Sequence, residues 1–196
     1  MGYYDMIAHS YNELHGDEQL NKLSIIMDNI EVTQKTRLLD VGCGTGLSSG
    51  FNCFVVGIDP ALGMLRINRS KIKVAGCAER LPFRDNSFDI VISVTAIHNF
   101  SSIGKAVQEM SRVCRGQLVF TILKKANDFE KIAQLLESSF IVSKKIEGEK
   151  DTIIICGKPQ GLYIENNYLL MITNETFCIN GAVSDSFVRS IHSAWT

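Results

Sequence analysis

The feature of this sequence that most constrains its fold is a glycine-rich segment, residues 38–46, that continues directly from a short apolar run. Glycines here allow a sharp turn and let a ligand approach the main chain within hydrogen-bonding distance. Seventeen residues after Gly42, a second apolar run ends in Asp59. An acidic side chain at the carboxyl end of the second strand of a βαβ unit is placed to accept hydrogen bonds from ribose hydroxyls. The segment therefore predicts a parallel sheet with a nucleoside-like ligand at its carboxyl edge.

The rest of the chain alternates short β-branched runs with helical or loop segments. Runs such as 90–92 and 119–122 are apolar on both faces, as strands buried in a parallel sheet are. The expected strands cover residues 37–41, 54–59, 73–77, 88–94, 117–123, 141–147 and 152–158. The last two are separated by turn residues and predict an antiparallel hairpin. We therefore predict an α/β fold, doubly wound, with a mostly parallel seven-stranded sheet and an antiparallel C-terminal hairpin.

Three local signals predict helices and their ends. An N-terminal helix is expected to bury one face that carries Leu20, Leu23, Met27 and Ile30. The helix before the fifth strand is expected to end with Gly116 at its C-cap position. Asn127 and Glu130 have the spacing of a capping box that begins the next helix.

Composition narrows the class of protein. Twenty Lys and Arg residues against 21 Asp and Glu give a net charge of −1, which weighs against a protein that wraps nucleic acid by electrostatics without excluding it. Six cysteines form no C-x-x-C pair, so we expect no metal site and no disulfide scaffold. The chain has no apolar run long enough to span a membrane and no signal-peptide pattern at its start, so we expect a cytoplasmic protein without a membrane role.

The composition changes after Pro159. Residues 161–196 hold one basic and three acidic residues and no lysine, whereas the first 160 residues are richly charged. We therefore expect a domain over residues 1–160 and a low-charge appendage over residues 161–196.

Two readings of the glycine segment compete with a single-nucleoside ligand. A dinucleotide site favours the pattern G-x-G-x-x-G, but Leu47 stands where the third glycine would be. Only a short segment, 46–54, is left for the helix that would hold a pyrophosphate. The other reading is a tight turn that binds nothing, which the spacing to Asp59 disfavours.

Four blocks in order resemble the class I S-adenosylmethionine-dependent methyltransferases, of the small-domain group that includes the ubiquinone/menaquinone-type enzymes. The resemblance covers about 120 of the 196 residues. The blocks are residues 39–46, 57–60 with 64–65, 78–83 with 87–89, and 91–100. The resemblance implies the Rossmann-like methyltransferase fold and S-adenosyl-L-methionine as cofactor.

The resemblance also implies roles for individual residues. Gly42 and Gly44 would line the methionine part of the cofactor, Asp40 would organise the loop, and Asp59 would hold the ribose diol. Cys77 and Ala78 would flank the adenine, Ser93 would contribute main chain near the sulfonium, and Tyr11 would cover the cofactor or the substrate mouth. Cys43 belongs to the same binding loop as a small residue. The cofactor-binding residues implied are thus Tyr11, Asp40, Gly42, Cys43, Gly44, Asp59, Cys77, Ala78 and Ser93.

Two departures from the family pattern bear on the site. Cys77 stands where the family often has an aspartate, and a thiol is a weak acceptor, so the contact to the adenine amino group is lost or passes to Glu79. The helix after the glycine loop is about one turn shorter than is usual.

The catalytic residues are expected just past the fourth strand. Thr95, His98 and Asn99 should border the transferred methyl group, with Thr95 and His98 as the catalytic candidates. His98 could be a general base with a pKa suited to neutral pH or a histidine that shapes the loop.

The resemblance implies a methyltransferase that acts on a small molecule or an RNA. The chain contains no large recognition insertion, so either the acceptor is small or a partner protein supplies the recognition surface. A catalytically silent cofactor-binding module that stabilises a partner protein is the alternative.

Overall fold

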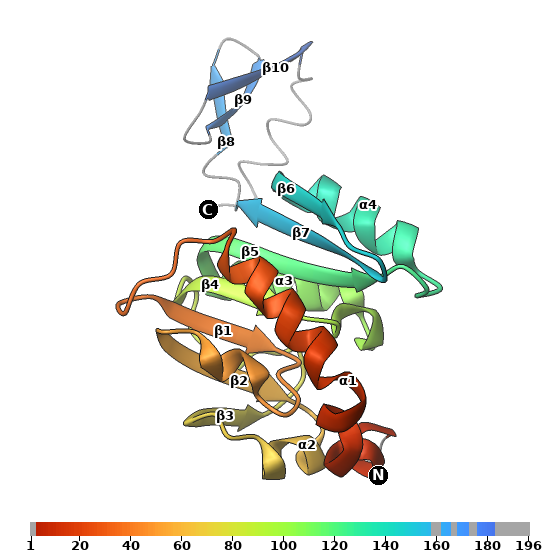
Figure 1. The fold of residues 1–196 in the computed structure, drawn as a ribbon. Helices are drawn as coiled ribbons and strands as arrows, with labels where there is room; N and C mark the ends of the chain where they lie inside the picture. The colour runs from red at the N-terminus through yellow and green to blue at the C-terminus, as the bar shows by residue number, and fades with distance from the viewer. Residues whose placement is uncertain (1–2, 158–161, 166–167, 173–175, 183–196) are drawn as a thin grey trace. The chain divides into compact units, whose positions relative to one another are not determined.

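The computed structural model describes residues 3–157, 162–165, 168–172 and 176–182, and the chain divides into two compact units, Met1–Lys158 and Pro159–Thr196. The first unit holds α1 (Tyr3–Met27), β1 (Arg37–Val41), the 3-10 helix η1 (Leu47–Gly50), β2 (Phe54–Asp59), α2 (Leu62–Ile67), β3 (Ile72–Ala75), β4 (Phe88–Ser93), the 3-10 helix η2 (Ile97–Asn99), α3 (Ile103–Val113), β5 (Cys114–Leu123), α4 (Phe129–Ser139), β6 (Ile141–Glu147) and β7 (Asp151–Gly157) (Figure 1).

The predicted seven-stranded sheet is confirmed. Its strand order is β3-β2-β1-β4-β5-β7-β6. The first five strands pair in parallel, and β7 runs antiparallel to both β5 and β6. The order reverses between β1 and β4, which is where open α/β sheets bind their ligands.

Two apolar clusters cover the two faces of the sheet, because successive side chains of a strand point to opposite faces. One cluster joins sheet residues such as Leu39 and Val91 to α3 and α4. The other joins sheet residues such as Leu38 and Ile92 to Leu23 and Ile26 of α1. Figure 1 shows α1 crossing one face of the sheet with α3 on the other. This is the doubly wound arrangement that the sequence predicted.

Helix α1 contacts the strands in nearly their order in the sheet. Its start meets the helix that follows β2, its middle meets the loop after β1, and its end meets the loop after β4 and the first residue of β7. The side-chain contacts are Asp5 with Gly63, Asn12 with Thr45, Lys22 with Thr95 and Asp151, and, just past the helix, Asn29 with Lys144 of β6.

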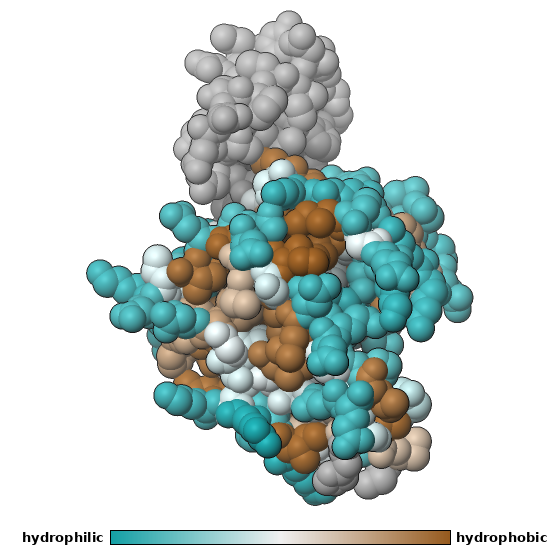
Figure 2. Space-filling view, in the orientation of Figure 1, coloured by the Kyte–Doolittle hydropathy of each residue, from teal (hydrophilic) through white to brown (hydrophobic). Residues whose placement is uncertain are grey.

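The face of α1 was predicted only in part. Leu23 is buried, but Leu20 and Met27 are 50% and 42% exposed, and the fully buried residue is Ile26. Apolar residues therefore lie on both the buried and the exposed side of α1. The surface in Figure 2, drawn in the same view as Figure 1, accordingly mixes hydrophobic and hydrophilic residues.

Two predicted helix ends are wrong. Gly116 does not cap a helix, since α3 ends at Val113 and β5 begins at Cys114. Gly116 lies inside β5, where a Cβ would be 2.4 Å from the carbonyl oxygen of Asp89, so a close backbone approach requires the glycine. The capping box is also absent, because the N-cap residue of α4 is Asp128, whose carboxylate pairs with Lys131.

The strand bounds differ by a few residues at two places. The third strand is Ile72–Ala75 instead of 73–77, and β5 begins three residues earlier than expected, at Cys114. The register of β4 and β5 shifts between Phe88 and Ile90, which accommodates the early start.

The second unit contains an antiparallel three-stranded sheet in the order β10-β9-β8, with β8 over Leu162–Glu165, β9 over Tyr168–Ile172 and β10 over Thr176–Ala182. The division of the chain into a domain and an appendage stays a prediction. In the part of the chain that the structure describes, none of the helices is both long enough and apolar enough to cross a membrane.

Candidate functional site

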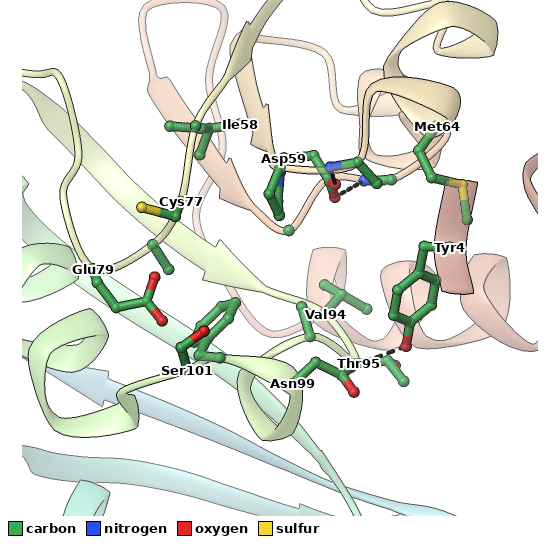
Figure 3. A pocket seen from close by; sticks show the side chains of 18 of the residues that line it. Tyr4, Ile58, Asp59, Met64, Cys77, Glu79, Val94, Thr95, Asn99 and Ser101 are labelled. Atoms are coloured by element: carbon green, nitrogen blue, oxygen red, sulfur yellow. Dashed lines mark hydrogen bonds between the residues drawn. The ribbon is translucent and has the colours of Figure 1, made fainter. Parts of the chain in front are cut away.

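A cleft of about 240 Å³ opens at the carboxyl ends of β1, β2 and β4, under the first half of α1 (Figure 3). Six of the nine predicted cofactor residues line it: Tyr11, Gly42, Gly44, Asp59, Cys77 and Ala78. Asp40 and Cys43 line a smaller hollow of about 40 Å³ that shares Tyr11, Gly42 and Gly44 with the cleft. Ser93 is fully buried in β4.

The glycine loop turns sharply because three of its residues are left-handed. Gly42, Gly44 and Gly46 have φ angles of 80°, 50° and 81°. The amides of Gly42 and Cys43 both donate to the carbonyl of Ile58, at 2.8 and 3.1 Å, which fastens the loop to β2. A Cβ on Gly42 would stand 2.4 Å from the Cβ of Ala96, whereas Gly44 faces open space. The loop thus packs closely at Gly42 and leaves open space beside the Cα of Gly44.

Asp59 ties the end of β2 to this loop. Its carboxylate accepts from the amide of Gly44 at 2.9 Å and from the amide of Ala61 at 2.8 Å. Burial raises the pKa of Asp59, although these two amide hydrogen bonds act to lower it. The carboxylate is therefore held in place by the main chain at the wall of the cleft.

Asp40 carries a buried oxygen without a partner. Ser48 donates to its Oδ2 at 2.5 Å, but Oδ1 is buried and has no hydrogen-bond partner. Burial raises the pKa of Asp40 to about 7, with Asp59 adding to the rise and the Ser48 hydrogen bond opposing it. Such an oxygen is costly to leave unpaired, so this hollow suits a ligand that carries a donor or a positive charge.

The residues that the resemblance assigns to the adenine belong to the segment after β3. Cys77 and Ala78 line the cleft after β3, and Cys77 is exposed. Glu79 also lines it and accepts from the amide of Ser102 at 3.1 Å. Although burial raises the pKa of Glu79, hydrogen bonds from backbone amides outweigh it and hold the pKa below the usual value. Glu79 thus offers a charged acceptor beside the Cys77 thiol.

Aromatic side chains of α1 cover the cleft. Tyr4 and Tyr11 both line it, and the side-chain amide of Asn99 donates to the Tyr4 hydroxyl at 3.0 Å (Figure 3). Burial raises the pKa of Tyr11 to about 12, so its hydroxyl stays protonated at neutral pH. Sequence reasoning identified Tyr11 but missed the contact between Tyr4 and Asn99, which joins residues 95 positions apart.

The two catalytic candidates lie in different places. Thr95 lines the cleft, as does Asn99. His98 lines a separate hollow together with Leu123 and residues 125–128, and its Nδ1 is buried without a partner. Burial lowers the pKa of His98, with Lys22 and Lys125 adding to the fall and Asp151 opposing it. The structure thus brings together Thr95 and the cofactor candidates, and sets His98 apart from them.

The cysteines and acidic groups show no metal chemistry within the described residues, where no cluster of three or more His, Cys, Asp or Glu could hold an ion. Burial raises the pKa of Cys43 far above its usual value, so its thiol is protonated and behaves as a small loop residue.

Comparisons with known proteins agree with this geometry. A family model described as a methyltransferase domain matches residues 39–120. An uncharacterised protein of Methanocaldococcus jannaschii is 30% identical over 165 residues, which cover 76% of this chain and 66% of that protein. The demethylmenaquinone methyltransferase of Renibacterium salmoninarum is 37% identical over 105 residues, which cover 48% of this chain and 44% of that enzyme. The chain therefore spans about half to two thirds of the length of these relatives.

A solved structure extends the likeness to the fold. The complex between the Trm112 methyltransferase activator of Haloferax volcanii and its candidate methyltransferase contains a chain with a TM-score of 0.69 and 13% identity, over 82% of this chain and 99% of that one. The sheet order, the glycine loop and the family model agree: residues 39–120 match a methyltransferase domain, and the fold is the one that S-adenosyl-L-methionine-dependent methyltransferases adopt.

Proposed function

We propose that this chain binds S-adenosyl-L-methionine in the cleft and transfers its methyl group to an acceptor that enters beside the loop after β4. The observation that carries the proposal is the unpaired, buried Oδ1 of Asp40, which lies at the glycine loop beside the cleft that Asp59 lines. These two carboxylates suit a ligand that carries both a positively charged ammonium group and a ribose.

The residues present fit such a ligand. The Asp40 carboxylate would pair with the ammonium of the methionine part, and the open space beside Gly44 leaves room for it. Asp59 would hold the ribose diol, Cys77 and Ala78 would flank the adenine, and Glu79 would take the adenine amino group in place of the thiol. Tyr11 would cover the ligand, Gly42 and Cys43 would complete the loop, and Ser93 would support it through the buried main chain of β4.

Methyl transfer from a sulfonium requires little acid–base catalysis by the protein. The cofactor supplies a methyl group on a sulfonium, which is already a good leaving group. The residues of this chain therefore have to orient donor and acceptor and keep water out. The tyrosines of α1 and the loop at residues 95–101 enclose the cleft and are placed to do this.

The two catalytic candidates receive different roles. The Thr95 hydroxyl already contacts Lys22, Gln19 and Thr121, so we assign it to positioning. Burial lowers the pKa of His98, and its Nδ1 has no hydrogen-bond partner. His98 is therefore a candidate base only for an acceptor that reaches the hollow lined by His98, Leu123 and residues 125–128. Its replacement by alanine should lower turnover about 10²–10⁴-fold if it is a base, with cofactor affinity nearly unchanged.

We favour a small-molecule acceptor over RNA. The net charge of −1 supplies no electrostatic attraction for a polyanion, and a relative of this chain is named for a methyl transfer to demethylmenaquinone. A partner protein that completes acceptor recognition is compatible with the Haloferax volcanii complex, whose methyltransferase works with an activator. We also propose a cytoplasmic location, because Cys43, Cys53, Cys77 and Cys156 are free thiols.

Calorimetric titration tests the proposal. S-Adenosylmethionine and S-adenosylhomocysteine should bind, and NAD should give no heat of binding. Asp59→Ala should weaken binding at least tenfold, because hydrogen bonds to a charged group contribute about 1.5–3 kcal/mol each. The matched control is Asp85→Ala, which removes an exposed carboxylate that pairs with Arg112 and does not line the cleft. Binding of NAD without a response to either sulfur ligand would overturn the proposal.

A methyl-release assay separates the enzyme from the alternative. Incubation of the bound cofactor with quinone precursors, tRNA and rRNA should give S-adenosylhomocysteine with one of these acceptors, with or without an activator protein. A protein that binds the cofactor tightly and transfers no methyl group to any acceptor would be the catalytically silent module.

A further inference from the structure

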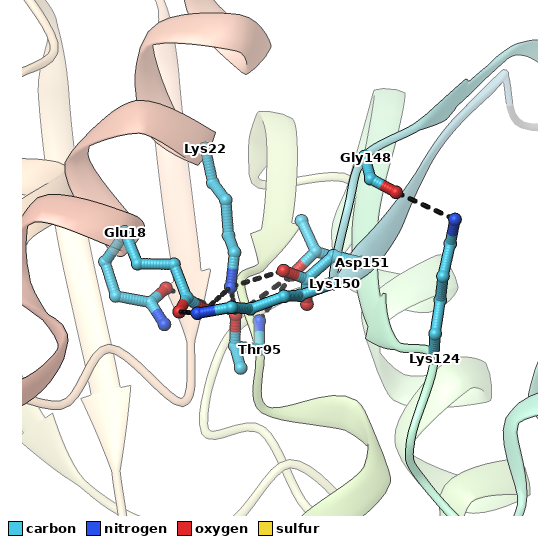
Figure 4. Close-up of polar contacts among 9 residues, drawn as sticks. Glu18, Lys22, Thr95, Lys124, Gly148, Lys150 and Asp151 are labelled. Atoms are coloured by element: carbon cyan, nitrogen blue, oxygen red, sulfur yellow. Dashed lines mark hydrogen bonds and ion pairs between the residues drawn. The ribbon is translucent and has the colours of Figure 1, made fainter.

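A buried lysine lies beside the cleft and takes no part in the binding roles proposed above. The side chain of Lys22 is 6% exposed, and its ammonium contacts Asp151 at 2.7 Å, Glu18 at 2.8 Å and the hydroxyl of Thr95 at 3.0 Å (Figure 4). These three contacts use the three N–H donors of the ammonium. They join α1, the start of β7 and the loop after β4 at one point.

Such a buried ion pair is a weak source of net stability, because desolvation of the two charges offsets their attraction. Its geometry, however, is fixed by three partners from three elements. The Glu18 carboxylate is held in turn by Lys150 at 2.9 Å, and these hydrogen bonds from Lys22 and Lys150 lower the pKa of Glu18 to about 2. The ammonium of Lys22 is therefore held at a defined position.

The hydroxyl that Lys22 contacts belongs to a strained residue. Thr95 has a φ angle of +55°, and a β-branched residue rarely adopts this left-handed conformation unless its surroundings enforce it. The Thr95 amide donates to the Thr121 hydroxyl at 2.6 Å, and the Thr95 hydroxyl donates to Gln19 at 3.2 Å while it accepts from Lys22. Lys22 makes the one charged contact among these.

The conformation of Thr95 sets the position of the next residues. Ala96 packs so closely on the glycine loop that a Cβ added at Gly42 would be 2.4 Å from the Cβ of Ala96. Thr95, Ala96, Asn99, Phe100 and Ser101 all line the cleft. If Thr95 changed to a negative φ, the residues that follow it would move relative to the cleft.

We propose that Lys22 is a positioning residue, which holds Thr95 in its left-handed conformation and thereby places the wall of the cleft where donor and acceptor meet. The role in methyl transfer rests on the proposed function. The effect on the loop does not, since it can be measured without any ligand.

Hydrogen exchange of the amides at residues 95–101, in the whole 196-residue chain without cofactor, measures the loop directly. Lys22→Met keeps the aliphatic stem and removes the charge, and exchange in this segment should become at least tenfold faster. Lys150→Met is the matched control, because it removes the other ammonium that contacts Glu18. The Lys150 side chain is 63% exposed and contacts no residue of the loop among the partners described. Loop exchange in this variant should match that of the wild type.

A second pair of variants tests whether Lys22 acts through Thr95. Glycine adopts a positive φ without support, so in a Thr95→Gly background the addition of Lys22→Met should change loop exchange less than twofold. Equal acceleration in both backgrounds would show that Lys22 only stabilises the fold and would overturn the proposal. Should Lys22→Met fail to fold, Thr95→Val serves, because it removes the hydroxyl and leaves Lys22 paired with both carboxylates. Unchanged loop exchange in Thr95→Val would equally overturn it.

Calorimetry with S-adenosylhomocysteine connects the loop to the ligand. Lys22→Met should lower the affinity at least fivefold, and Lys150→Met should not. A wild-type protein that binds neither sulfur ligand refutes the proposed function, while the exchange experiment still decides the role of Lys22. If the wild type binds the ligand but loop exchange is the same in Lys22→Met and the wild type, only the proposed role of Lys22 is refuted.

Discussion

The two walls of the cleft are built in different ways. The glycine wall, residues 42–46 with Asp59, is made of main chain whose amides bond to Ile58 and to the Asp59 carboxylate. The loop wall, residues 95–101, is held by side chains that come from α1 and β5. The amide bond from Gly44 to the Asp59 carboxylate spans 15 positions of the sequence, and the longest contact of the glycine wall, from Thr45 to Asn12, spans 33. The side-chain contacts of the loop wall span 26 to 95 positions.

This difference separates two ways of making a binding site. The backbone of the glycine wall is fixed mainly by the strand–turn–strand unit, so most of its shape is encoded locally. The loop wall exists only once the helix and the distant strands have docked. Substitutions in the first should act through backbone strain and those in the second through lost side-chain contacts.

The largest effect is expected from Gly42→Ala in the glycine wall. The new methyl group would meet Ala96, and alanine is strained at a φ of 80°, so together these cost about 2–6 kcal/mol. S-Adenosylhomocysteine affinity, measured by calorimetry, should fall at least about 30-fold, or the protein should not fold. Gly104→Ala, at a helical glycine with open space around it, is the control and should be neutral or slightly stabilising.

A double variant sharpens this result. Gly42→Ala with Ala96→Gly removes the clash between the two walls and leaves the backbone strain. Partial recovery is expected. Full recovery would mean that the contact between the walls, and not the left-handed backbone, sets the shape of the loop.

The next effect concerns the buried carboxyl of Asp40 and depends on pH. Burial raises the pKa of Asp40 to about 7, so the folded protein holds this proton more tightly than the unfolded chain, where aspartate titrates near 4. The stabilisation is fully present below about pH 4 and is lost as the pH rises through about 7. Asp40→Asn has no proton to lose, so its free energy of unfolding should exceed that of the wild type increasingly from pH 5 to pH 8, by about 1–4 kcal/mol.

Urea unfolding at several pH values measures this difference. Asp85→Asn, at an exposed carboxylate, should show the wild-type pH dependence. Parallel curves for Asp40→Asn and the wild type would contradict the shifted pKa.

A smaller effect is expected from Tyr4→Phe in the loop wall. The substitution keeps the ring and removes the hydroxyl that accepts from Asn99, a hydrogen bond with a net contribution of about 0.5–1.5 kcal/mol. Affinity for S-adenosylhomocysteine should therefore fall about 2–10-fold. Tyr3→Phe, at a ring that is 63% exposed, should change nothing. A loss as large as that of Asp59→Ala would mean that the two walls contribute equally.

The smallest effect is expected from removal of residues 160–196. The described residues that line the cleft all belong to the first unit. A chain that ends at Pro159 should keep its melting temperature and its affinity, which thermal unfolding and calorimetry can establish. A clear fall in melting temperature would show that the first unit requires the appendage.

The sequence predicted the sheet well because its strands are short β-branched runs that are apolar on both faces. The bounds of β1, β2 and β6 match the structure residue for residue. The start of β5 was missed because Gly116 resembles a helix cap in sequence, whereas in the structure it permits a close approach to Asp89.

The site residues also differ in how far the sequence could predict them. Local spacing was enough to identify Gly42, Gly44 and Asp59, which the structure brings to one wall. Lys22 and Thr121 gave no sequence signal, since only the packing of α1 and β5 brings them to Thr95. The expectation that His98 borders the cleft overlooked η2, whose three residues point in directions about 120° apart, so that Asn99 and His98 face different hollows.

The path of α1 along the sheet has a consequence for how the molecule opens. Local openings of a protein usually involve cooperative units smaller than the domain. Here one helix and its following turn are bonded in succession to segments beside β2, β1, β4, β7 and β6, so these strands cannot separate from one another without loosening the helix. The first unit should therefore behave as a single cooperative unit, in which a ligand held near β2 slows amide exchange as far away as β6.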